Sequence, residues 1–122
     1  MKHPVVWFEV LGEDGAKLQR FYGELFGWKI DANNAMKYGM VEAQAGGMQG
    51  IPGGVGGTYA GMRPMVTFYV ETPEIGKTLA EAQRLGAKVV LPRKELPAGP
   101  PIALFQDPEG HLIGLVEHMA AA

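Results

Sequence analysis

One order of elements occurs twice along this chain of 122 residues. In the first half, a strand-like VWFEV comes before a helical pattern and LFGWKI, and in the second half VTFYV comes before a helical pattern and RLGAKV. A repeat of this length that occurs only twice favours two similar modules packed as a pair over a solenoid of many short units. The sequence therefore predicts an α+β fold in which two paired β-α-β-β-β modules form a curved mixed sheet around a cavity.

The first half is predicted to contain one helix and four strands. A β-branched and aromatic run over residues 4–11 is typical of a strand. Between Asp14 and Gly27, apolar side chains recur at helical spacing and predict one buried helix face, with Gly27 as the C-terminal cap. That stripe consists of Leu18, Phe21, Tyr22, Leu25 and Phe26. Shorter strands are expected over residues 28–31, 37–43 and 48–51.

The second half is predicted to repeat this order. A strand over residues 65–71 leads to Thr72 as helix N-cap and Pro73 in the first turn. The buried helix stripe consists of Ile75, Leu79 and Ala82. Gly86 ends the helix, and strands follow over residues 87–91, 102–106 and 111–117. Asp-Pro-Glu-Gly at residues 107–110 predicts the turn between the last two strands.

Composition favours a single domain over residues 1–122, with module one over about residues 1–57 and module two over about 62–119. Glycine is concentrated in residues 46–61, which we interpret as a flexible connector or a mobile flap. The chain carries 11 basic and 13 acidic residues with no block of like charge, so no nucleic-acid or membrane partner is expected. The absence of cysteine and of a long apolar run favours a cytoplasmic protein.

Alternation along the strands predicts which side chains face the cavity. If Phe8 packs on the first helix and Phe68 on the second, the opposite face of the two opening strands lines the hollow. Those residues are Val5, Trp7, Glu9, Met65, Thr67 and Tyr69. Among them Glu9 is the candidate catalytic residue, because a partly desolvated carboxylate can serve as a general base. Its structural alternative is a pair with Arg63 or a backbone donor at the rim.

Three segments resemble the vicinal oxygen chelate superfamily, which includes glyoxalase I, bleomycin-resistance proteins and extradiol dioxygenases. They are FYGELFGWKI at residues 21–30, LGAKVV at 85–90 and FQDPEGHLIGLVE at 105–117. The chain looks most like the uncharacterised small glyoxalase-like proteins of that group. The resemblance implies paired β-α-β-β-β modules, usually assembled as a homodimer, and it places Leu112, Gly114 and Val116 on the cavity side of the last strand.

The resemblance also locates the divalent-metal ligands of the family's enzymes, which are His, Gln or Glu on the first and last strands of each module. The matching positions here include Val5, Met65 and Gly114, none of which has a side chain that binds a hard cation. Residues 43–70 contain no Asp, Glu or His for the remaining position, and Gln44 and Gln49 are its only weak candidates. We therefore expect no metal and no other cofactor. A relocated metal site drawn from His3, Glu9, Glu42, His111 and His118 is the alternative.

These observations favour a metal-independent protein that binds a small organic molecule between the modules, in the manner of a sequestering resistance protein. The expected ligand-binding residues are Trp7, Glu9, Met48, Met65, Thr67, Tyr69, Leu112 and Gly114. Whether the chain is an enzyme stays open: a lyase, isomerase or dioxygenase of the same superfamily with a non-standard metal site is the alternative. A third possibility is a structural or regulatory protein whose hollow is filled by its own side chains. His111, beside the 107–110 turn, is interpreted as a turn residue.

Overall fold

A computed structural model describes residues 2–44, 49–59 and 61–118. The chain divides into two compact units, Trp7–Thr67 and the combination of Met1–Val6 with Phe68–Ala122. The opening strand of each module therefore begins in one unit and ends in the other.

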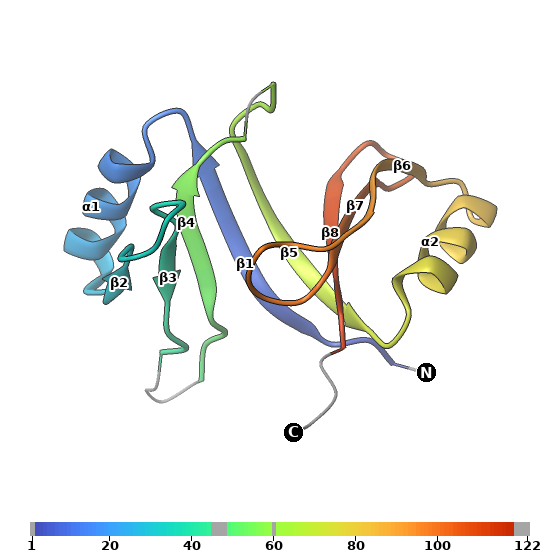
Figure 1. The fold of residues 1–122 in the computed structure, drawn as a ribbon, viewed down its shortest axis with the longest axis horizontal. Helices are drawn as coiled ribbons and strands as arrows, with labels where there is room; N and C mark the ends of the chain where they lie inside the picture. Colours follow the sequence, from blue (N-terminus) through green and yellow to red (C-terminus); the bar gives the residue numbers. More distant parts are fainter. Residues whose placement is uncertain (1, 45–48, 60, 119–122) are drawn as a thin grey trace. The chain divides into compact units, whose positions relative to one another are not determined.

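Module one has the predicted β-α-β-β-β order (Figure 1). Its elements are β1 (Val5–Gly12), α1 (Gly15–Phe26), β2 (Ile30–Asp31), β3 (Gly39–Val41) and β4 (Gly53–Gly57). The strands lie in the order β2-β3-β4-β1, with β1 parallel to β4 and the other neighbours antiparallel. The sheet of this module is therefore mixed, as predicted.

Strand β4 corrects the sequence interpretation. Its sequence is GGVGG, and it lies inside the stretch interpreted as a flexible connector, whereas the strand predicted over residues 48–51 does not form at 49–51. Residue 48 lies outside the described residues. Glycine is poor in isolated strands, so propensity argued against this assignment. Here β4 is held between β1 and β3, and four of its five residues are buried.

Helix α1 begins and ends where predicted, but its apolar stripe is more exposed than expected. The Asp14 side chain accepts a hydrogen bond from the Lys17 backbone N–H, and Gly27 ends the helix in the left-handed conformation with φ of 70°. None of the helix residues is buried, and Phe21, Leu25 and Phe26 are 54%, 58% and 55% exposed. The prediction of a buried stripe was therefore wrong for these three residues.

Aromatic rings, and not a continuous buried stripe, connect α1 to its sheet. Trp28 lies 5.3 Å from Phe8 of β1, 5.7 Å from Tyr22 and 5.1 Å from Phe26, measured between ring centroids. Phe8 therefore faces the helix, as the strand alternation predicted.

Module two repeats the order, with longer second, third and fourth strands (Figure 1). They are β5 (Met65–Thr72), α2 (Ile75–Arg84), β6 (Lys88–Lys94), β7 (Ile102–Gln106) and β8 (Leu112–Glu117). The strands lie in the order β5-β8-β7-β6, with β5 parallel to β8 and the other pairs antiparallel. The predicted α+β fold class is thus confirmed, module by module.

The core of module two lies between α2 and its sheet. Ile75, Leu79, Ala103 and Leu115 form a buried cluster, and Val70, Val89 and Phe105 pack against it. Full burial of an isoleucine or leucine side chain contributes about 1.5–3 kcal/mol to stability. The predicted α2 stripe is therefore confirmed, with Ile75 and Leu79 buried and Ala82 half-buried.

The start of α2 differs from the prediction. The N-cap residue is Glu74 rather than Thr72, and its side chain makes no capping hydrogen bond. The backbone N–H of Ile75 instead donates to the Glu117 carboxylate of β8, at 3.1 Å. Arg93 of β6 holds that carboxylate through two nitrogen atoms, Nη at 2.8 Å and Nε at 3.1 Å. A distant acceptor supplies the cap, which local sequence could not indicate.

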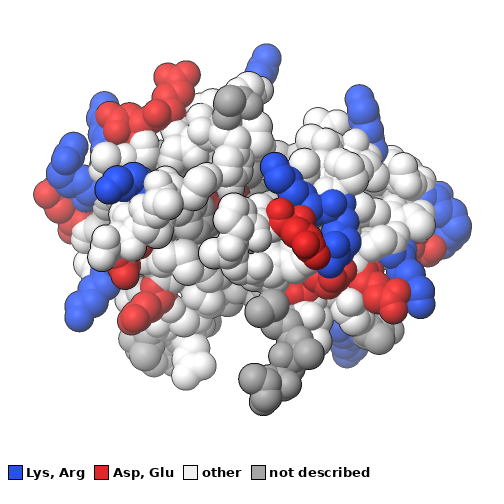
Figure 2. Space-filling model, viewed as in Figure 1, with Lys and Arg blue, Asp and Glu red and all other residues white. Residues whose placement is uncertain are grey.

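On the face shown in Figure 2, acidic and basic side chains are interspersed, in keeping with the mixed charge pattern of the sequence. Among the described residues, no helix is long and apolar enough to cross a membrane.

We predict that Glu117→Gln lowers the urea midpoint of unfolding more than Glu95→Gln, the control. Glu95 also pairs with Arg93, at 3.5 Å, but its side chain is 77% exposed and caps no helix. Hydrogen bonds from Arg93 and then from the Ile75 N–H hold the pKa of Glu117 below its usual range. The stabilisation is therefore present above the unfolded-state pKa, about 4.3, and is lost as pH falls through the lower folded-state value. Equal midpoints for the two variants at pH 7 would contradict the capping role.

Candidate functional site

A chain of three polar side chains crosses module one from β1 to the segment before β3. The indole Nε1 of Trp7 donates to the Tyr38 hydroxyl at 3.0 Å, and that hydroxyl donates to Glu9 Oε2 at 2.8 Å. Glu9 is only 4% exposed. Because Trp7 and Glu9 alternate with Phe8 along β1, they lie on the face opposite to α1, as the sequence predicted. The structure thus gives Glu9 the Tyr38 hydroxyl as a donor, a partner that sequence reasoning missed.

Local backbone interactions set the position of Tyr38. The Asn34 side chain accepts from the Tyr38 N–H at 2.9 Å and donates to the Tyr38 carbonyl at 2.8 Å. Lys37, directly before it, has φ of 54°, in the left-handed region that few residues other than glycine adopt. The Gln19 side chain of α1 donates to the Lys37 carbonyl at 2.9 Å. The phenol is therefore aimed by its own loop and by α1.

Strand β4 provides the space that the phenol occupies. Gly54 pairs with Glu9 of β1 on one side and with Met40 of β3 on the other. It therefore lies between the strand that carries Glu9 and the strand that follows Tyr38. A Cβ atom at Gly54 would collide with the Tyr38 hydroxyl, and one at Gly53 would collide with the Phe8 ring. These two glycines let rings from neighbouring elements lie flat on both faces of β4.

The electrostatics of this site keep its hydroxyls protonated. Burial, and next the nearby Glu9 charge, raise the pKa of Tyr38 far above its usual range. The same two causes raise the pKa of Tyr59. A tyrosine that stays protonated remains a hydrogen-bond donor at every physiological pH. The site therefore combines a buried carboxylate with phenol and indole groups.

The matching position in module two has a tyrosine but no carboxylate. Tyr69 is 4% exposed and pairs with Gly114 of β8, where a Cβ atom would collide with the Tyr69 ring. Val70 and Leu115 pack with the α2 cluster, so Tyr69 and Gly114 occupy the face opposite to α2. Leu112 and Val116 share this face with Gly114. The orientation assigned to β8 is therefore the observed one.

Two other predicted ligand-binding residues lie on β5. Thr67 is 6% exposed and shares a face of β5 with Tyr69. Met65 instead borders an apolar surface pocket of about 320 Å³ near the end of β1. The other residues of that pocket are Val10, Leu11, Gly12, Leu18, Pro64 and Val66. Met48 lies outside the described residues.

His111 is a turn residue in the structure, as expected. The Asp107 carboxylate accepts from the backbone N–H groups of Glu109 and His111, each at 2.9 Å, and lies 3.0 Å from His111 Nδ1. These hydrogen bonds, with the His111 backbone first, hold the pKa of Asp107 below its usual range. Gly110 completes the turn with φ of 92°.

Comparisons with known proteins agree with the paired modules. The family model for the glyoxalase-like domain matches residues 8–116, so the chain belongs to the glyoxalase-like family. This places it in the glyoxalase, bleomycin resistance and dioxygenase superfamily that the sequence motifs resemble. No curated protein matches.

Solved structures of low sequence identity share the fold. A superfamily member from Vibrio splendidus 12B01 is 17% identical with a TM-score of 0.61, over 96% of this chain and 100% of that chain. A Streptomyces coelicolor methylmalonyl-CoA epimerase variant in complex with 2-nitronate-propionyl-CoA is 14% identical with a TM-score of 0.67, over 97% and 96%. A Legionella pneumophila protein described as NAD-dependent benzaldehyde dehydrogenase is 11% identical with a TM-score of 0.68, over 93% and 98%. At these identities the likeness shows the fold alone.

The pairing of opening and closing strands bears on the metal positions that the resemblance implies. Gly54 pairs with Glu9 as Gly114 pairs with Tyr69, so the first-half position that sequence could not locate is Gly54. Neither glycine offers a donor atom, and tyrosine rings fill the space where a ligand side chain would begin. Val5 and Met65, at the other two positions, offer no hard donor either. The residues at these four positions do not fit a divalent metal.

The relocated metal site, the alternative considered from the sequence, finds no support in the part of the chain that the structure describes. There, no group of three or more His, Asp or Glu side chains is arranged to hold a metal ion.

We predict that Gly54→Ala destabilises the protein by about 1–3 kcal/mol, because the added methyl group must displace the Tyr38 phenol. Gly76→Ala is the matched control, since a Cβ there meets no atom within 4 Å. Gly76 lies within α2, where alanine is favoured over glycine by about 0.5–1 kcal/mol. Urea unfolding followed by tryptophan fluorescence measures both. A Gly54→Ala protein as stable as Gly76→Ala would refute the proposed close packing.

We predict that Tyr38→Phe costs about 1–3 kcal/mol near pH 7, because the Glu9 carboxylate and the Trp7 indole each lose a partner. The raised pKa of Tyr38 means that the unfolded chain ionises this phenol near pH 10 while the folded protein does not. Stability from this residue is thus complete below pH 10 and declines above it. The difference between wild type and variant, measured by urea unfolding, should shrink from pH 9 to pH 11. A constant difference would exclude the shift.

Proposed function

We propose that this glyoxalase-like protein binds a small organic molecule without a divalent metal at the family's usual positions. The ligand would contact the face of module one that carries Trp7, Tyr38 and Glu9, with the carboxylate or the phenol fixing one polar group. The single observation that carries the proposal is that tyrosine rings lie against Gly54 and Gly114, at positions where the resemblance implies metal ligands.

The chemistry of the Glu9 chain supports binding over metal-assisted reaction. Small-molecule sites are mostly apolar with a few oriented polar groups, and here hydrogen bonds of 2.8–3.0 Å orient the Trp7 indole, the Tyr38 hydroxyl and one Glu9 oxygen. Solved relatives of this fold include an epimerase in complex with a CoA derivative, so the fold accommodates small-molecule ligands. A role for Glu9 as general base is part of this proposal.

Two further features complete the proposal. We infer a homodimer, on the resemblance to the family and on the exposed Phe21, Leu25 and Phe26 of α1. We also infer a cytoplasmic location, on the cysteine-free composition. A sequestering role of the resistance-protein type is inferred from the family resemblance and from the Trp7 and Glu9 side chains. Light scattering on the purified protein tests the dimer.

The first experiment is metal analysis of protein purified without chelator or affinity tag. We expect less than about one tenth of an equivalent of nickel, zinc, manganese or iron. Titration with each metal should leave the melting temperature unchanged. One tightly bound equivalent would overturn the metal-independent function.

A thermal-shift screen of aromatic and aliphatic small molecules follows, with Glu9→Gln as the variant. Glutamine keeps the size and an acceptor oxygen for Tyr38 but removes the charge, so a ligand that is fixed by Glu9 should lose about tenfold or more in affinity. Glu24→Gln, on the solvent-exposed part of α1, is the control and should bind unchanged. Equal affinity of the two variants would show that Glu9 does not fix the ligand.

A further inference from the structure

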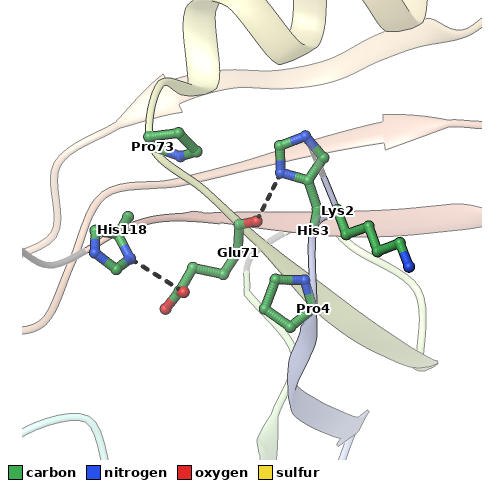
Figure 3. Close-up of a pocket in the computed structure, with 6 residues that line it drawn as sticks. All are labelled: Lys2, His3, Pro4, Glu71, Pro73 and His118. Carbon is green, nitrogen blue, oxygen red and sulfur yellow. Dashed lines mark hydrogen bonds and ion pairs between the residues drawn. The ribbon is translucent and has the colours of Figure 1, made fainter.

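A second pocket, unrelated to the Glu9 chain, lies where the N-terminal segment meets the end of β5. It has a volume of about 260 Å³ and is lined by Lys2, His3, Pro4, Glu71, Pro73 and His118 (Figure 3). All six residues belong to one compact unit. Two of the chain's three histidines therefore border the same hollow.

Glu71 orients both imidazole rings. His118 Nδ1 lies 3.1 Å from Glu71 Oε1, and His3 Nδ1 lies 3.2 Å from the Glu71 carbonyl oxygen. The two rings flank Glu71 in Figure 3. A carboxylate and a carbonyl oxygen only accept hydrogen bonds, so each neutral ring carries its hydrogen on Nδ1. Each Nε2 is then an acceptor when the ring is neutral and a second donor when it is protonated.

Backbone hydrogen bonds hold this arrangement in place. The Glu71 N–H donates to the Pro4 carbonyl at 2.9 Å, and the His118 N–H donates to the Thr72 carbonyl at 2.5 Å. Pro4 and Pro73 form rigid apolar walls. The two histidines are thus carried by backbone that is tied to β5 at adjacent residues.

Protonation of the rings makes the net charge of the pocket positive. With neutral histidines, Lys2 and Glu71 give no net charge; with both rings protonated, the six lining residues carry two net positive charges. Figure 3 shows Lys2 extending away from Glu71, whereas the two imidazole rings flank Glu71. The rings are therefore the donors beside this carboxylate. On the neighbouring elements, Glu117 is paired with Arg93 and Glu74 with Lys77. Glu71 is the carboxylate that competes with a bound anion.

We propose that this pocket binds a small oxyanion, a phosphate or carboxylate group, between the imidazolium rings of His3 and His118. A protonated imidazole attracts an anion and a neutral one does not. Binding therefore strengthens as pH falls, and the ammonium of Lys2 adds long-range attraction. This site is separate from the proposed ligand face at Glu9, so either can fail without the other.

The test is titration of the whole protein with inorganic phosphate and, in a second arm, acetate, observed through the histidine Cε1–H resonances at pH 5.5 and pH 7.5. Sodium chloride at equal ionic strength is the salt control. His111 is the internal control, because it pairs with a carboxylate at a similar 3.0 Å but lies outside the pocket. We expect saturable shifts of His3 and His118, no saturable shift of His111, and affinity about tenfold or more weaker at pH 7.5.

His118→Gln should weaken the anion affinity at pH 5.5 by about fivefold or more, because the amide still bonds to Glu71 but carries no charge. His111→Gln should leave it unchanged. A response to phosphate but not to acetate identifies a phosphate site, and the reverse identifies a carboxylate site. Three outcomes would each overturn the proposal. They are parallel shifts of all three histidines, no shift beyond that of chloride, and broadening of the His118 resonance by Zn²⁺ with no response to either anion.

Discussion

The absence of side chains at two positions of strand β4 is the constraint on which module one depends. Gly53 and Gly54 leave room for the Phe8 ring on one face and the Tyr38 phenol on the other. The Phe8 ring reaches Trp28 and through it the α1 aromatic residues, while the phenol reaches Glu9. The connection of helix to sheet and the polar chain at the candidate site therefore rest on the same short strand.

In module two the helix packs on its sheet in another way. It has a conventional buried aliphatic cluster below α2, and its helix start is capped by Glu117 from the last strand. It retains one glycine under a tyrosine, at position 114. The two modules share an order of elements and a parallel pairing of opening and closing strands, but they differ in what fills their interiors. In module one the tyrosine hydroxyl donates to a carboxylate, that of Glu9.

Family membership and site chemistry support different conclusions. The fold and the family model place the chain among glyoxalase-like proteins, and solved structures of this fold are described as proteins of different activities. The positions that the resemblance matches to the metal ligands of the family's enzymes hold Val5, Met65 and Gly114, and the strand register adds Gly54. Since the reaction of a fold depends on its site residues, the likeness of fold does not transfer an activity to this chain.

Sequence alone determined the repeat, the fold class, the ends of α1, the Asp107 turn and the face on which Trp7 and Glu9 lie. These follow from local periodicity and from residues whose conformational preferences act locally, such as Gly27. Strand β4 could not be predicted, because glycine strands are stabilised by their neighbours and not by propensity. The exposure of Phe21, the Glu117 cap and the place of Tyr38 beside Glu9 were decided by the tertiary structure, since each depends on contact between residues far apart in the chain.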